Sequence, residues 1–185
     1  MFSLQEAQDI LNNADLIVDE KTIHKAISQL AEHITETMKT SYPLILTVMG
    51  GSLVFAGQLL PKLHFPIDFN YIHASRYGNE TSGGQLIWRQ EPQEEVNGRH
   101  VLVLDDILDE GHTMKAIRDK ILSLGAKSFR CAVLFNKLIK QSKPIKADFV
   151  GLDIPDRFVF GFGIDVKGAW RNLPAIYAVR SLSIS

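Results

Sequence analysis

Short runs of consecutive apolar residues alternate along the chain with longer segments in which apolar residues recur every three or four positions. The apolar runs lie at 44–48, 101–104 and 130–135, and residues 67–72 alternate between apolar and polar. Continuous apolar runs are typical of strands buried on both faces of a parallel sheet, and alternation is typical of a half-exposed strand. Helical spacing occurs at 23–38, 52–63 and 113–124. The pattern therefore predicts an α/β fold with a mainly parallel, twisted sheet flanked by helices.

The first forty residues are predicted to be helical, with a break near Asn12 and Asn13. Ser3 and Glu6 have the spacing of a capping box, in which a hydroxyl and a carboxylate each satisfy a backbone N–H of the first turn. The helix after the break buries one face and ends before Pro43.

Two segments depart from the alternation of apolar strands and amphipathic helices. Residues 76–97 are polar and rich in glycine, and a connection of this length in a compact domain is usually a functional lid, a hairpin arm or disorder. The tail from residue 148 has short strand-like pieces and no clear helix. Neither a repeat nor a linker divides the chain, so residues 1–185 are predicted to form one domain.

Composition excludes several classes of function. Twenty basic residues against 21 acidic ones leave a net charge of −1, so no global basic field is present to hold nucleic acid. The first residues lack a basic segment followed by an apolar run, and no apolar stretch could cross a membrane. The single cysteine, Cys131, cannot form an internal disulfide, so we expect a cytoplasmic protein and a buried thiol. The six histidines form no close helical pair, and no zinc site is expected.

The segment 101–114 carries most of the chemical information. Four apolar residues lead directly into Asp105 and Asp106, and a tight acidic turn with Gly111 and Thr113 follows. Ligands of open parallel sheets bind beyond the carboxyl ends of the strands, and the N–H groups at a helix N-terminus suit a phosphate. The acid pair would then accept hydrogen bonds from sugar hydroxyls or hold Mg²⁺. Alternatively, the acids only stabilise the turn and the helix N-terminus. The combination of an apolar run, several acids, a glycine and a threonine favours a phosphosugar site.

This segment resembles the 5-phosphoribosyl-1-pyrophosphate (PRPP) signature of type I phosphoribosyltransferases, and the chain is most similar to the hypoxanthine-guanine phosphoribosyltransferase family. The similarity extends from about Leu44 to Arg171. Its further motifs are Val48-Met49-Gly50-Gly51, Ser75-Arg76-Tyr77-Gly78, Lys146-Ala147-Asp148-Phe149-Val150-Gly151, Ile154-Pro155-Asp156-Arg157-Phe158-Val159, Asp165 and Arg171-Asn172-Leu173. The PRPP motif is specific to the superfamily, whereas the segments beginning at Lys146 and Ile154 point to enzymes that use 6-oxopurines.

The resemblance implies transfer of phosphoribose from PRPP to hypoxanthine, and guanine as a second base, with release of pyrophosphate, in purine salvage. It implies a small hood formed by about 148–185 and the N-terminal segment, and a flexible lid at about 75–97. Mg²⁺ is the implied cofactor. The implied partners are the two small-molecule substrates and further copies of the chain, as a homodimer or homotetramer, and neither nucleic acid nor a membrane.

The resemblance also assigns roles to residues. Asp105 and Asp106 would bind the ribose hydroxyls, directly or through Mg²⁺, and Asp109 would be the general acid and base at purine N7. The PRPP 5-phosphate is expected at Glu110, Gly111, His112 and Thr113. Pyrophosphate is expected at Met49, Gly50, Gly51 and Arg171. Met49 departs from relatives that have lysine at this position.

The purine is expected at Lys146, Phe158, Val159 and Ile107. Lys146 would donate to the 6-oxo group and Phe158 would stack on the ring. Alternatively, Lys146 belongs to a solvated basic run with Lys140 and Lys143. Asp165 is expected near a second Mg²⁺ or the purine edge, and Ser75 and Tyr77 are expected in the lid near pyrophosphate.

Two other functions remain open on the sequence. The first is a phosphoribosyltransferase-fold regulator that senses PRPP or nucleotides and binds nucleic acid. The second is a phosphoribosyltransferase that prefers xanthine. A P-loop kinase or a dinucleotide-dependent oxidoreductase would need glycine motifs that this chain lacks.

Overall fold

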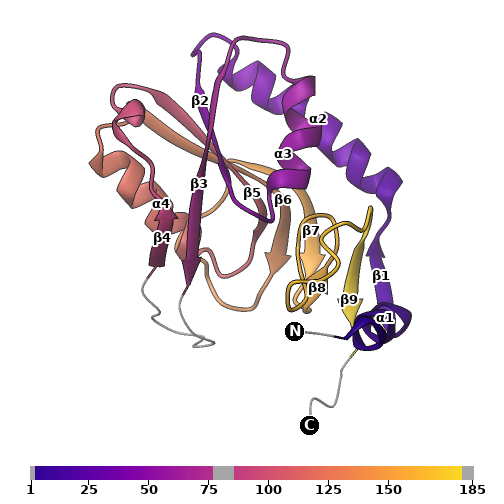
Figure 1. Cartoon of the computed structure of the whole chain (residues 1–185). Coiled ribbons are helices and arrows are strands. Elements are labelled where there is room, and N and C mark those ends of the chain that lie inside the picture. The colour runs from indigo at the N-terminus through magenta and orange to yellow at the C-terminus, as the bar shows by residue number, and fades with distance from the viewer. Residues whose placement is uncertain (1–2, 77–85, 181–185) are drawn as a thin grey trace.

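The computed structural model describes residues 3–76 and 86–180, and a six-stranded sheet forms its centre (Figure 1). The strand order is β4-β3-β2-β5-β6-β7, and every neighbouring pair is parallel except β3 and β4. The strands are β2 (Leu44–Val48), β3 (Asp68–Arg76), β4 (Leu86–Gln90), β5 (His100–Leu108), β6 (Ser128–Leu138) and β7 (Phe149–Pro155). The predicted α/β class with a mainly parallel sheet is confirmed.

Helices cover both faces of this sheet because side chains of successive strand residues point to opposite sides. Leu102 and Leu104 of β5 pack in the core that contains α2 (Glu20–Met38) and α3 (Leu53–Leu59). Val101 and Val103 pack in a second core with α4 (His112–Ser123). A single 3₁₀ turn, η1 (Leu60–Lys62), follows α3. Burial on both faces explains why the central strands are continuously apolar.

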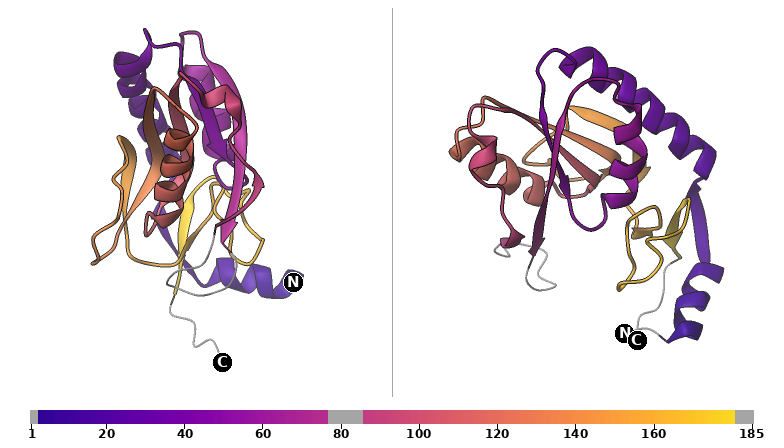
Figure 2. Two further views of the ribbon diagram at one scale, coloured as in Figure 1. Left: turned by 90° about the vertical axis from the view of Figure 1, so that its left-hand side faces the viewer. Right: turned by 45° about the horizontal axis from the view of Figure 1, so that its top comes forward.

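A small antiparallel sheet stands beside the central one and joins the two ends of the chain (Figure 2). Its order is β1-β9-β8, made of β1 (Ala14–Val18), β9 (Ile176–Val179) and β8 (Val159–Phe160). These strands lie in the N-terminal and C-terminal segments, where the hood is expected. The prediction that the first forty residues are all helical is wrong at β1. Its Leu-Ile-Val run pairs with β9, a partner more than 150 residues away that local spacing does not reveal.

The helix that precedes β1 has the predicted start. In α1 (Leu4–Asn12), Ser3 N–H donates to Glu6 Oε2 over 2.7 Å, and Glu6 N–H donates to Ser3 Oγ over 3.2 Å. The capping box is therefore confirmed. In the described part of the chain, no helix is long and apolar enough to cross a membrane.

The polar segment 76–97 contains more regular structure than its composition indicates. β4 pairs antiparallel with β3, and a 3₁₀ turn, η2 (Glu94–Val96), follows it. The hairpin arm named among the three alternatives for this segment is thus present in its described part.

Candidate active site

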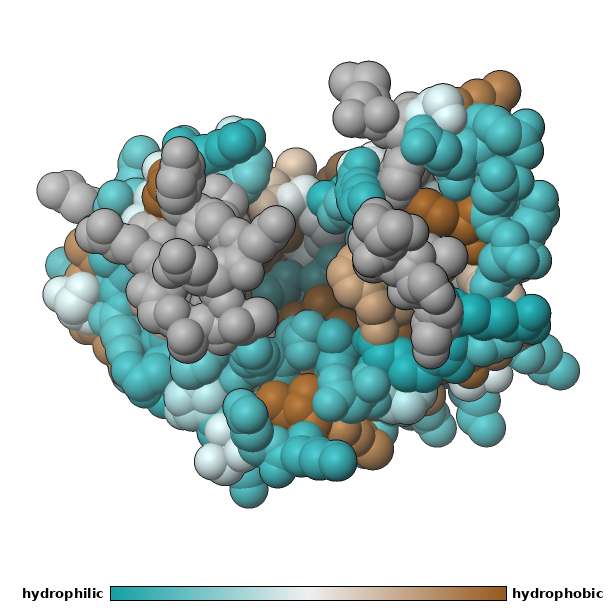
Figure 3. All heavy atoms as spheres, turned by 90° about the horizontal axis from the view of Figure 1, so that it is seen from below, coloured by the Kyte–Doolittle hydropathy of each residue, from teal (hydrophilic) through white to brown (hydrophobic). Residues whose placement is uncertain are grey.

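A cavity of about 480 Å³ opens at the carboxyl ends of β2 and β5. Figure 3 shows this edge of the molecule from below, with a hollow near the centre of the view. The lining residues are Val48, Met49, Gly50, Gly51, His73, Ala74, Asp105, Asp106, Ile107, Leu108, Asp109, Glu110, Gly111, His112, Thr113, Met114 and Arg171. The acid-rich segment, the Met49–Gly51 loop and Arg171 are therefore brought together, as the sequence predicts.

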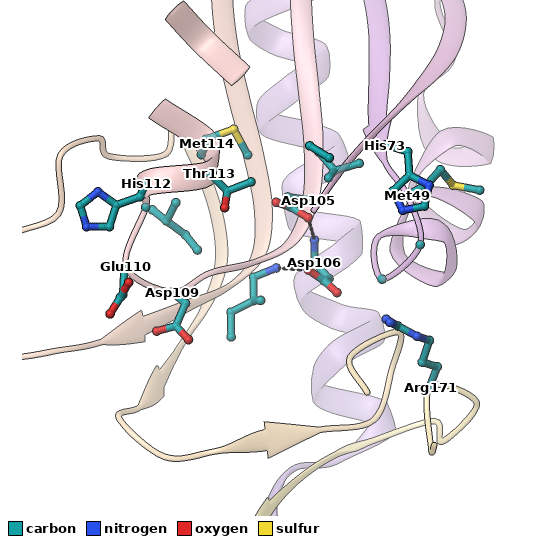
Figure 4. A pocket seen from close by; sticks show the side chains of 17 residues that line it. Met49, His73, Asp105, Asp106, Asp109, Glu110, His112, Thr113, Met114 and Arg171 are labelled. Carbon is teal, nitrogen blue, oxygen red and sulfur yellow. Dashed lines mark hydrogen bonds between the residues drawn. The ribbon is translucent and has the colours of Figure 1, made fainter. Parts of the chain in front are cut away.

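The turn between β5 and α4 presents backbone N–H groups to this cavity. Gly111 precedes α4 with φ of +83°, a left-handed conformation that glycine adopts without strain. Among the described residues, no side chain caps the helix start. The first N–H groups of a helix have no partner within it, so those beginning at His112 are available to an anion, and Thr113 adds a hydroxyl on the same turn (Figure 4).

Asp105 and Asp106 are adjacent residues near the carboxyl end of β5, followed in the strand by Ile107 and Leu108. Asp105 Oδ1 accepts a hydrogen bond from the Asp106 N–H over 3.0 Å, and Asp106 Oδ1 accepts from the Ile107 N–H over 2.8 Å. Burial raises the pKa of Asp105 well above its ordinary value, and the charge of Asp106 raises it further. The pKa of Asp106 is also raised by burial, although Arg171 acts in the opposite direction. The adjacent carboxyl groups of the half-buried Asp105 and the buried Asp106 form an oxygen-donor pair suited to cations or hydroxyl donors.

The loop after β2 closes tightly on this acid pair. Met49 N–H donates to the Ile72 carbonyl over 2.8 Å, and the Ser52 hydroxyl donates to the Val48 carbonyl. The Met49–Gly50 peptide bond is cis. A Cβ placed on Gly51 would lie 1.8 Å from Asp106 Oδ2, so only glycine fits beside this carboxylate.

Arg171 reaches the cavity from the loop that precedes β9. Its Nη1 donates to the Gly163 carbonyl over 2.6 Å, and its Nη2 pairs with Asp165 Oδ1 over 2.5 Å. Figure 4 shows the guanidinium directed toward Asp106 and the Met49–Gly51 loop. Asp165 thus orients the cation of the site and does not itself line the cavity.

Asp109 has a cationic partner that sequence analysis did not identify. Lys137 Nζ lies 2.6 Å from Asp109 Oδ2 and donates to it, and the Lys137 side chain is only 11% exposed. The parallel register of β5 and β6 pairs Leu108 with Asn136, which places Lys137 beside the residue after Leu108. A lysine at the carboxyl end of an apolar strand, next to the acid-rich strand, was the signal that could have revealed it.

Lys146, the lysine that the sequence suggested as donor to the 6-oxo group, does not lie beside Asp109. It is exposed, and its backbone carbonyl faces Cys131 Sγ at 3.9 Å. Cys131 pairs with Val103, so this part of the loop lies about 16 Å along the strand from the Leu108–Asn136 pair, at about 3.3 Å per residue. The structure does not bring Lys146 to Asp109, and it brings Lys137 there instead.

The other predicted purine residues are divided between the cavity and the small sheet. Ile107 lines the cavity. Phe158 precedes β8 and is 60% exposed, whereas the Val159 side chain is buried in the core. Ser75 belongs to β3, and Tyr77 lies outside the described residues. His73, at the carboxyl end of β3, lines the cavity and was not predicted.

In the ranges 3–76 and 86–180, no three histidine, cysteine, aspartate or glutamate side chains converge as a preformed metal site. Asp165 is not joined to Asp105 and Asp106 in such a cluster. The two adjacent carboxylates still fit a hard cation such as Mg²⁺, which is commonly held by one or two carboxylates together with substrate oxygens.

A mainly parallel sheet in which an acid pair is followed by a glycine turn and a helix agrees with the comparison to known proteins. The phosphoribosyl transferase domain model matches residues 13–167. The chain belongs to the phosphoribosyltransferase family.

Three similar proteins show which members of this family it resembles. It is 32% identical over 162 residues to a hypoxanthine-guanine phosphoribosyltransferase from Bacillus subtilis, covering 87% of this chain and 90% of the relative. The crystal structure of a hypoxanthine-guanine phosphoribosyltransferase from Bacillus anthracis superposes with a TM-score of 0.83 at 29% identity, covering 90% of this chain and 98% of that one. A hypoxanthine phosphoribosyltransferase from Trypanosoma cruzi also gives a TM-score of 0.83, at 29% identity over 92% of this chain and 97% of that one.

Proposed function

We propose that this protein transfers 5-phosphoribose from PRPP to a 6-oxopurine, hypoxanthine first and guanine second. The products are inosine or guanosine monophosphate and pyrophosphate, which makes the reaction one of purine salvage. The activities named for the Bacillus and Trypanosoma relatives support this choice of substrates. The observation that carries the proposal is the contact of Lys137 with Asp109 beside the phosphate-binding turn.

The phosphosugar is held by the part of the cavity built on β5 and α4. Backbone N–H groups from Glu110 to Thr113 bind the 5-phosphate, and Asp105 and Asp106 accept hydrogen bonds from the ribose hydroxyls. The N–H groups of the Met49–Gly51 loop and the Arg171 guanidinium bind pyrophosphate. Met49 contributes its backbone alone, so Arg171 is the cation on this side of the cavity.

The base is held between the carboxyl edge of the sheet and the small sheet. Asp109 exchanges a proton with purine N7, and Lys137 donates to the 6-oxo group while it keeps Asp109 oriented. This assignment transfers to Lys137 the role that the sequence suggested for Lys146. Phe158 is exposed and can stack on the purine, and residues of the hood and Ile107 complete the pocket.

Bond cleavage at a ribose carbon with oxocarbenium character requires a neutralised leaving group and exclusion of water. Asp105 and Asp106 would hold Mg²⁺, which when bound supplies positive charge to the pyrophosphate oxygens. Asp165 contributes to pyrophosphate binding indirectly, because it orients the Arg171 guanidinium. Ser75 and Tyr77 are proposed to belong to a lid that excludes water.

Initial rates of pyrophosphate release, measured in parallel with hypoxanthine, guanine, xanthine and adenine in the presence of PRPP and Mg²⁺, test the proposal. We expect hypoxanthine and guanine to be used faster than xanthine, and adenine to be used least. Faster use of adenine would contradict the role of Lys137 as donor to a 6-oxo group. Nucleotide binding without release of pyrophosphate from PRPP in the presence of any of the four bases would favour a PRPP-sensing regulator.

Location and assembly complete the proposal. Burial raises the pKa of the Cys131 thiol to about 12, so this free cysteine is an unreactive core residue that fits a reducing cytoplasm. We propose association as a homodimer or homotetramer. Light scattering on the purified chain, with and without PRPP and Mg²⁺, distinguishes these states from a monomer.

A further inference from the structure

Lys143 connects the carboxyl ends of β5 and β6. Its Nζ donates to the Leu108 carbonyl over 2.6 Å and to Asn136 Oδ1 over 2.7 Å. Leu108 and Asn136 are register partners at the ends of β5 and β6. The residue after each of them is a member of the Asp109–Lys137 pair. One ammonium group therefore fixes the positions from which both members of that pair extend.

The same loop also packs against the phosphate-binding turn. A Cβ placed on Gly111 would lie 3.4 Å from both Lys143 Cβ and Ile145 Cγ2. Asn136 extends the contact network, because its Nδ2 donates to Asp153 Oδ1 on β7 over 2.7 Å. The Lys143 ammonium thus bonds β5 and β6 directly and reaches β7 through Asn136, while the Lys143 Cβ lies beside the turn.

This lysine differs from the other two of its basic run. Lys140 and Lys146 are exposed, whereas Lys143 is partly buried, and this burial lowers its pKa. A desolvated ammonium is unfavourable unless its hydrogen bonds are satisfied, and charge-assisted bonds are the stronger kind. Two such bonds, to a backbone carbonyl and to a side-chain amide, indicate a specific structural contact.

We infer that Lys143 is a positioning residue for phosphoribosyl transfer, which holds the turn from Asp109 to Gly111 and keeps its N–H groups directed at the 5-phosphate. The inference rests on the proposed function. Lys143 touches neither substrate; it acts through the Leu108 carbonyl, which it draws away from the anion, and through Asn136. Its loss therefore affects ligands that carry a 5-phosphate and not pyrophosphate, which binds at Arg171 and the Gly51 loop.

The test compares Lys143→Met with Lys140→Met, which removes the same charge from an exposed position in the same loop. Calorimetry with inosine monophosphate and with pyrophosphate, each with Mg²⁺, gives two affinities for each protein. For Lys143→Met we expect the affinity for inosine monophosphate and the KM for PRPP to worsen about 10-fold or more, as for loss of a charge-assisted hydrogen bond. Pyrophosphate affinity should stay within about twofold of the wild type, and Lys140→Met should leave all three values unchanged. Equal losses for both ligands, or no loss for either, would overturn the inference.

Hydrogen exchange at 109–113 gives a result that does not depend on activity. We expect exchange there to be faster in Lys143→Met than in the wild type and in Lys140→Met, and equal rates would also overturn the inference. Where Lys143→Met does not fold, Lys143→Gln retains a polar side chain that ends one bond shorter, and the same selective loss is expected. If exchange is faster in Lys143→Met than in the wild type but the wild-type protein shows no turnover, the proposed function alone is contradicted.

Discussion

Lys137 Nζ donates to Asp109 Oδ2 over 2.6 Å, although the two residues are 28 positions apart in the sequence. The contact arises because β5 and β6 are parallel neighbours that end at the same edge of the sheet. It places the Lys137 ammonium and the Asp109 carboxylate together at the start of the turn between β5 and α4. In the proposed reaction, the group that would exchange a proton with the base and the group that would recognise its oxygen are thereby held in one fixed geometry.

Replacing Lys137 separates its role from that of Lys146. Lys137→Met should lower kcat/KM for hypoxanthine about 10- to 150-fold, the range expected when a hydrogen bond to a charged group is lost. Lys146→Met should change it less than about threefold, because Lys146 is exposed. Steady-state kinetics at saturating PRPP measures both. The opposite ranking would restore Lys146 as the donor.

Asp109→Asn preserves the size of the side chain and removes its capacity to accept a proton. We expect kcat to fall by roughly 10²–10⁴-fold, the usual contribution of a general acid or base. PRPP affinity should remain near that of the wild type, because the turn amides and the acid pair are retained. Single-turnover rates and equilibrium binding measure the two effects, and near-normal turnover would remove Asp109 from this role.

Asp105 should limit the stability of the unliganded protein at neutral and alkaline pH. Burial raises its pKa, so the native state holds a proton more tightly than the unfolded chain. Stability should therefore fall as pH rises from the ordinary value of 3.8 through the raised native pKa.

Asp105→Asn removes this titration while its side-chain oxygen can still accept from the Asp106 N–H. We expect a higher Tm than the wild type at pH 8, by about 2–4 °C for each kcal/mol gained in the free energy of unfolding. Below pH 4 we expect no difference in Tm. Binding of PRPP with Mg²⁺ should weaken. Asp119→Asn, at an exposed ion-paired position, is the control and should not raise Tm. A variant no more stable than the wild type at pH 8 would contradict this account.

Gly51→Ala should damage the site through a single methyl group. The new Cβ would lie 1.8 Å from Asp106 Oδ2, so the carboxylate or the loop must move. We expect kcat/KM for PRPP to fall at least about 100-fold, on the scale of catalytic losses from misplacement of about 1 Å. The matched control is Gly57→Ala in α3, where a Cβ would meet nothing within 4 Å. It should keep full activity and gain about 0.5–1 kcal/mol of stability.

The sequence predicts the central sheet well because burial on both faces leaves a local signature. The run at 44–48 coincides with β2, and the acid-rich segment lies at the carboxyl end of β5 as expected. In contrast, β1 was assigned to a helix, because a five-residue strand whose partner is the distant β9 has no periodicity of its own to distinguish it.

The site was predictable where its residues are contiguous and much less so where it depends on strand register. The turn from Asp105 to Thr113 could be found as one motif. The choice between Lys137 and Lys146 depends on where β6 ends relative to β5. Sequence spacing does not contain that information, since a shift of a few residues moves a side chain by more than its own length.

The pairing of β1 with β9 has a consequence for the order in which the two halves of the site are made. Asp15 contacts Arg180 across 165 residues of sequence, and Ala14 is the register partner of Val179. During synthesis β1 is the first strand to emerge, whereas β9, its partner among the described residues, is the last. Contacts of such long sequence separation form late because a large loop must close first. The part of the cavity built on β5 and α4 can therefore assemble on a growing chain, whereas the small sheet is completed only when the two ends meet.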